Sequence, residues 1–77
     1  MIIFEKNRVM DFKWEDGFMI AVKNEGGQVV ISANREGLLS LANNLRTLAD
    51  ETPGCHFHLD MYNSLEEGSA ELVVEKC

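Results

Sequence analysis

Hydrophobic and polar residues alternate along most of the chain, which is the pattern of strands with one buried face. Residues 2–6 (IIFEK) predict a first strand, and residues 11–33 alternate in pieces separated by Asp16-Gly17 and Gly26-Gly27. Both dipeptides predict hairpin turns, because Gly readily adopts the positive φ of a tight turn and Asp tolerates it. The first part of the chain therefore predicts an antiparallel meander.

The pattern around Asp16-Gly17 allows two interpretations. A tight two-residue turn would pair Trp14 with Met19 and direct Phe18 to the other face. The alternative is one bulged, continuous strand. It follows from the even positions shared by the apolar residues Phe12, Trp14, Phe18, Ile20 and Val22. We favour the turn, and the strand count stays at five or six.

The period changes to three and four residues after Asn34, which predicts a helix over about residues 35–50. The apolar positions are Leu38, Leu41, Ala42, Leu45, Leu48 and Ala49. Asn34 is placed to cap the first turn, and Pro53-Gly54 ends the helix. We expect the apolar stripe to pack on the sheet.

Two further alternating segments, residues 55–62 and 69–76, are joined by residues 63–68 (NSLEEG), which predict a hairpin loop. Their apolar faces match when Phe57 pairs with Val74, Leu59 with Leu72, and Met61 with Ala70. The predicted fold is a single α+β domain over residues 1–77, a two-layer sandwich in the order β-meander, helix, β-hairpin. One face of a mostly antiparallel sheet of five or six strands carries the helix.

The same register collects polar side chains on the outer face of the predicted sheet. It sets His56 opposite Glu75, His58 opposite Val73, and Asp60 opposite Glu71. The resulting candidate site is His56, His58, Asp60, Glu71 and Glu75.

This candidate site has two chemical interpretations. His56, His58 and Asp60 are ligand types that suit a divalent metal such as zinc. Solvent-exposed or partner-facing polarity explains the same alternation, and an HxHxD string is too short to be specific. We favour a protein partner over an ion.

Charge and composition exclude several classes of function. The chain carries 7 Lys+Arg against 13 Asp+Glu, a net charge of −6, which argues against nucleic acid and favours a basic protein partner. The N-terminus fits neither a signal peptide nor a membrane span, so we expect a cytoplasmic protein with no membrane partner.

Cys55 and Cys77 fall on opposite faces of the predicted hairpin, which predicts free thiols. No serine has a recognisable nucleophile setting, and we expect no enzymatic activity.

Residues 31–76 resemble the thirty-second family of immunity proteins from bacterial polymorphic toxin systems. The segments that carry the resemblance are Asn34-Arg35-Glu36-Gly37-Leu38, His56-x-His58-Leu59-Asp60 and Leu65-Glu66-x-Gly68-Ser69. The first 30 residues lie outside it. The resemblance implies an intracellular bacterial protein that binds and neutralises a cognate toxin domain. Two alternatives are a small metal-binding module and a structural homodimer formed through sheet edges or the outer face.

Overall fold

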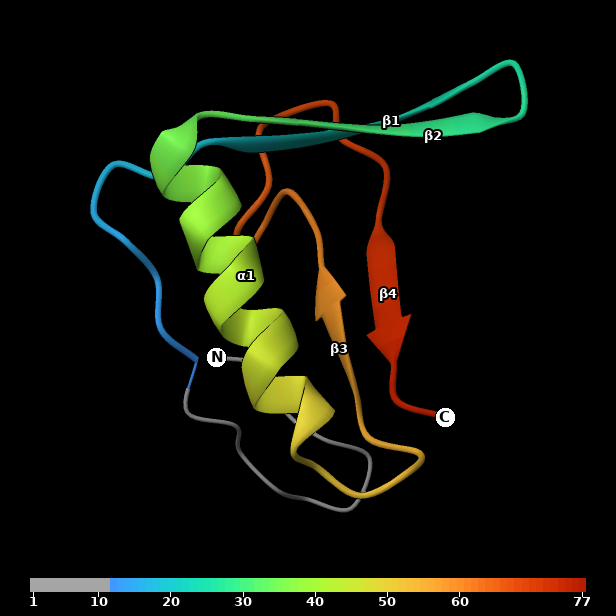
Figure 1. Ribbon diagram of the computed structural model, residues 1–77. Coiled ribbons are helices and arrows are strands. Elements are labelled where there is room, and N and C mark those ends of the chain that lie inside the picture. The colour runs from blue at the N-terminus through green and yellow to red at the C-terminus, as the bar shows by residue number, and fades with distance from the viewer. Residues whose placement is uncertain (1–11) are drawn as a thin grey trace.

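The chain folds into one helix and four short strands in the computed structural model, which describes residues 12–77 (Figure 1). In chain order these are β1 (Ile20–Glu25), β2 (Gln28–Ala33), α1 (Arg35–Ala49), β3 (His56–Leu59) and β4 (Leu72–Glu75). The α+β class is confirmed. The predicted sheet of five or six strands is wrong, because the described strands form two separate antiparallel pairs, β1 with β2 and β3 with β4. The strand predicted at residues 2–6 lies outside the described residues.

Residues 60–71 explain why the two strand pairs do not merge into one regular sheet. This long connection between β3 and β4 runs beside β1, where the backbone N–H of Glu66 donates to Ile20 O (2.8 Å) and that of Ala70 donates to Val22 O (2.8 Å). Between these bonds Val22 N–H is satisfied by the hydroxyl of Ser69 (3.2 Å) instead of by a backbone carbonyl. An irregular segment thus takes the place of a strand next to β1.

The turn at Asp16-Gly17 forms, but it does not make a hairpin. Phe18 N–H donates to Glu15 O (3.2 Å) and Gly17 has φ 79°, so the chain reverses there. Residues 12–19 contain no strand, so both the pairing of Trp14 with Met19 and the continuous strand are wrong. Residues 12–18 form what we call the N-terminal strap, and the rings of Trp14 and Phe18 lie 4.9 Å apart in it.

The N-terminal strap is held by side chains of α1. Lys13 N–H donates to Asn44 Oδ1 (2.9 Å), and Glu15 N–H donates to Ser40 Oγ (2.8 Å). A segment outside any sheet needs acceptors for its backbone N–H groups, and here two polar helix residues supply them. The strap therefore packs on a polar face of α1, at a position where a helix usually presents its apolar stripe.

The second glycine turn is confirmed. Glu25 pairs with Gln28, which leaves Gly26 and Gly27 as a two-residue turn, with φ of 57° and 85°. Positive φ at both positions is the backbone of a type I′ turn, which matches the twist of the two flanking strands.

Helix α1 forms where predicted, but it is rotated about its axis. Its buried residues are Gly37, Ser40, Asn44 and Leu48. Of the predicted stripe, Leu48 is buried and Leu41 is partly buried, whereas Ala42 and Ala49 are exposed, as are Leu38 (56%) and Leu45 (45%). The prediction that the whole stripe packs on the sheet is wrong, because the strap's hydrogen bonds select the neighbouring polar face. Among residues 12–77 no helix is long and apolar enough to cross a membrane.

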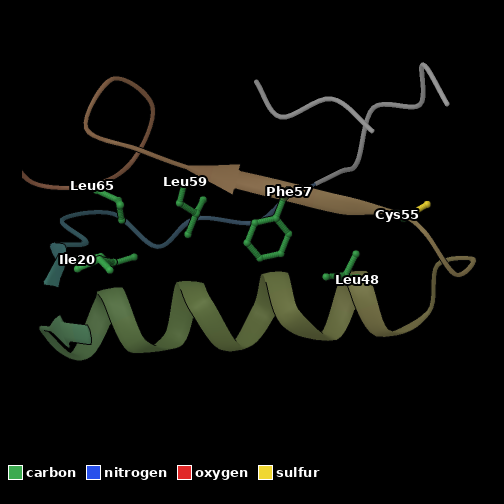
Figure 2. Packing of buried hydrophobic residues seen from close by; sticks show 7 residues of the cluster. Ile20, Leu48, Cys55, Phe57, Leu59 and Leu65 are labelled. Atoms are coloured by element: carbon green, nitrogen blue, oxygen red, sulfur yellow. The ribbon is translucent and has the colours of Figure 1, made fainter. Parts of the chain in front are cut away.

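The core lies between α1 and β3 (Figure 2). Its buried members are Ile20, Val22, Leu48, Cys55, Phe57, Leu59 and Leu65. Phe57 is fully buried, and its ring forms a T-shaped pair with that of Phe12, with 5.1 Å between the ring centroids. Both cysteines are free thiols, Cys55 buried in this core and Cys77 exposed.

The predicted register of the last strand pair is confirmed in its central part. Phe57 pairs with Val74 and Leu59 with Leu72, with their buried side toward α1. The strands are shorter than predicted, since β3 ends at Leu59 and β4 begins at Leu72. Met61 and Ala70 are exposed and unpaired in the ladder, so their predicted pairing is wrong.

Candidate functional site

The side of β3 and β4 that points away from α1 carries the candidate site. We define the outer face as His56, His58, Glu71, Val73 and Glu75. His56 pairs with Glu75 and His58 with Val73, as the sequence predicts. All but His56, which is partly buried, are exposed. The strands' alternation places the outer face opposite the core because successive side chains point to opposite sides.

The two imidazoles of the outer face are held by different acceptors. His58 Nδ1 lies 3.1 Å from Glu71 Oε2, and His56 Nδ1 lies 3.3 Å from Gly54 O. A carboxylate and a carbonyl only accept, so both contacts place a hydrogen on Nδ1. The ring centroids are 5.0 Å apart, with one edge toward the other face. Because His58 and Glu71 are both about half exposed, their pair contributes at most about 1 kcal/mol to stability.

Asp60 lies just beyond β3 and builds a turn. Its Oδ1 accepts from the backbone N–H of Tyr62 (2.9 Å) and of Asn63 (3.1 Å), and its carbonyl accepts from Leu65 N–H (2.8 Å). Asn63 Nδ2 in turn donates to His58 O (2.9 Å). An Asp whose side chain bonds the backbone two residues on is a common turn former. The alternation of residues 55–62 predicts a strand position for Asp60 instead, and this prediction is wrong. Asp60 is thus not paired with Glu71.

The predicted metal site has two of its three ligands near each other. His56 and His58 are neighbours, whereas the carboxylate of Asp60 already accepts two backbone hydrogen bonds. Residues 12–77 contain no group of three or more His, Cys, Asp or Glu side chains placed to hold a metal ion. Metal binding stays a prediction from the sequence.

The connection between β3 and β4 carries two further exposed features. Glu66 and Glu67 are exposed on it, which adds two acidic side chains to the segment that leads to Glu71. Tyr62, directly after the Asp60 turn, is 87% exposed. The amino-acid sequence gives no sign that Tyr62 is exposed, because a tyrosine at an alternating position usually packs in a core or at an edge.

A shallow apolar hollow of about 300 Å³ lies elsewhere, where β1 and β2 meet the start of α1. Small side chains of Ala21, Ser32 and Ala33 line it, and Glu66 stands at its side. None of the outer-face residues lines this hollow.

Comparison with known proteins places the chain in a family. Neither curated proteins nor solved structures gave a match to it. A family model described as Immunity protein 32 matches residues 28–77, from β2 to the C-terminus. The matched part contains α1, the outer face and the connection between β3 and β4. Because the match covers more than half of the sequence, the chain belongs to the Immunity protein 32 family.

Proposed function

We propose that this protein binds a cognate bacterial toxin domain in the cytoplasm and neutralises it, so that the cell that makes the toxin is protected. Membership of the Immunity protein 32 family is the observation that carries the proposal. The protein acts in this account by binding and blocking its partner, without chemistry of its own.

The outer face is the surface we assign to the toxin. Glu71 and Glu75 are exposed on this face, and Glu66 and Glu67 are exposed on the connection that precedes β4, in a chain with a net charge of −6. The nearby Lys76 points its ammonium elsewhere and donates to Ala49 O at the end of α1. Such a one-signed surface attracts a basic partner and accelerates its encounter. The toxin domain is accordingly basic at its contact surface.

The outer face also has the apolar and aromatic groups that a stable interface needs at its centre. Val73 is 49% exposed and lies opposite His58, with glutamates on both sides along the chain. Tyr62, in the turn that follows β3, offers a large, amphipathic ring that is 87% exposed. Interfaces combine apolar or aromatic anchors at the centre with a polar rim, over roughly 800 Å² per partner. Val73 and Tyr62 are the anchors in this proposal, and the glutamates form the rim.

Co-expression with the toxin domain encoded beside this gene tests the proposed function. We expect the toxin domain alone to stop growth, and this protein to restore growth and to co-purify with the toxin. The matched control is Phe57→Asp, which places a charge in the core and should abolish both protection and binding because the fold is lost. A neighbouring gene without any toxin domain, or toxicity unchanged by the wild-type protein, would refute the proposal.

A further inference from the structure

Helix α1 carries a regular apolar strip on its exposed side. The strip consists of Leu38, Ala42, Leu45 and Ala49, at successive spacings of four, three and four residues. All four are exposed, with Leu38 at 56% and Leu45 at 45%. A spacing that alternates between three and four residues is the seam along which one helix packs against another.

No described element covers this strip. The strap and the core contact a different part of the helix, through Gly37, Ser40, Asn44 and Leu48. The apolar strip lies roughly 125° around the axis from that buried face, as follows from 3.6 residues per turn. Among residues 12–77 α1 is the one helix, so the described part of the chain offers the strip no helical partner.

We propose that two copies of this protein associate by packing α1 against α1 in antiparallel orientation. Side-chain size makes the strip complementary to itself in this arrangement. An antiparallel pair centred in the middle of the strip sets Leu38 against Ala49 of the second copy and Ala42 against Leu45 of the second copy. Each large side chain then meets a small one, which lets the two helices approach to about 8 Å.

Charge favours the same orientation. Arg35 is the first residue of α1, and Asp50 directly follows its last residue; both are exposed. The antiparallel pair brings Arg35 close to Asp50 of the second copy, once at each end. A parallel pair would set Arg35 beside Arg35 and lose both attractions. Arg35 is available for this contact because its present partner is the adjacent Glu36, at 3.5 Å and with the arginine side chain 78% exposed.

The proposed dimer leaves the toxin-binding surface free. Phe57 and Leu59 point from β3 toward α1, so the outer face lies on the far side of the strand pair from the helix (Figures 1 and 2). The helix is 15 residues long, which gives it about 22 Å of contact length. A single helix pair of this length buries less than a standard interface, and we expect a dissociation constant in the micromolar range.

Sedimentation equilibrium of the full chain tests the association. We expect the mass to rise from 8.7 kDa toward twice that value as the concentration is raised from about 1 to 200 µM. The variant Leu38→Glu with Leu45→Glu should stay monomeric throughout. Val29→Glu with Met61→Glu, which changes two apolar residues of similar exposure elsewhere, should dimerise as the wild type does.

Circular dichroism checks that each variant is folded. All four substituted positions should tolerate a glutamate, because they are exposed. A wild-type chain that stays monomeric over the whole range would overturn the proposal. So would a dimer that persists in the Leu38→Glu, Leu45→Glu variant.

Disulfide cross-linking tests the orientation separately. In a Cys77→Ser background, Leu38→Cys and Ala49→Cys are prepared as two single variants and mixed under oxidising conditions. The antiparallel pair should give the cross-linked species between the two variants, since a disulfide needs Cα atoms within about 7 Å. Leu38→Cys alone should remain largely uncrosslinked. Efficient cross-linking of that variant with itself would show a parallel arrangement and contradict the proposal.

Discussion

Asn34 shows how one side chain connects the N-terminal strap to the helix. Its Oδ1 accepts from Gly37 N–H (2.7 Å) and from Met19 N–H (2.9 Å), and its Nδ2 donates to Gly17 O (2.9 Å). The first bond is the helix cap that the sequence predicts. The other two were not predictable from the sequence, because they depend on a tertiary contact between the start of α1 and residues 17–19.

Two substitutions of Asn34 separate these roles. Asn34→Ser keeps a capping oxygen but is too short to reach Gly17, and we expect a loss of about 1 to 2 kcal/mol in the free energy of unfolding. Asn34→Ala also loses the cap and should cost about 1 kcal/mol more. Urea unfolding followed by circular dichroism measures both. Equal stability of the Ser and Ala variants would contradict the capping role.

Gly37 is required by the close approach of the chain before β1. A Cβ at this position would overlap the carbonyl oxygen of Met19 and lie 3.0 Å from both Ala33 Cβ and Ile20 Cγ1. Helix propensity alone favours Ala over Gly by about 1 kcal/mol. We expect Gly37→Ala nevertheless to lower the melting temperature, because the steric overlap involves backbone. A higher melting temperature would show that propensity outweighs the contact.

At the scale of the helix, the sequence showed which residues share a face but not which face is buried. Periodicity groups Leu38, Leu45 and Leu48 on one stripe, and the usual inference is that this stripe meets the core. The strap changes the outcome, because its N–H groups bond Ser40 and Asn44. Sequence alone could not show this, since residues 12–18 alternate as a strand would and give no sign that they run along a helix.

The polar face of α1 is testable through Ser40. Its Oγ accepts from Glu15 N–H (2.8 Å) and donates to Glu36 O (2.8 Å), and the residue is fully buried. We expect Ser40→Ala to cost about 1 to 3 kcal/mol of unfolding free energy, because the Glu15 N–H is left without its acceptor. Ser32→Ala, on the exposed side of β2, is the control and should be neutral. Equal values for the two variants would exclude a stabilising role for the strap.

At the scale of the whole molecule, local pairings were predictable and the assembly of the sheet was not. The Gly26-Gly27 turn and the pairing of Phe57 with Val74 follow from turn chemistry and matched apolar faces, which the sequence contains directly. The separation into two strand pairs depends on residues 60–71 lying along β1, a long-range placement that short-range patterns do not encode. Of the candidate site, four residues lie on the side of β3 and β4 that points away from α1: His56, His58, Glu71 and Glu75. Asp60 lies beyond β3, in a turn.

Association kinetics with the cognate toxin domain test the central claim that the acidic outer face receives the toxin. The variant Glu71→Lys with Glu75→Lys should lower the association rate constant about tenfold or more at low salt, with a smaller effect on dissociation. Asp16→Lys with Glu25→Lys makes the same charge change at exposed positions in the strap and at the β1–β2 turn, and should leave most of the rate intact. An unchanged rate for the first variant, or an equal fall for both, would contradict the assignment of this face.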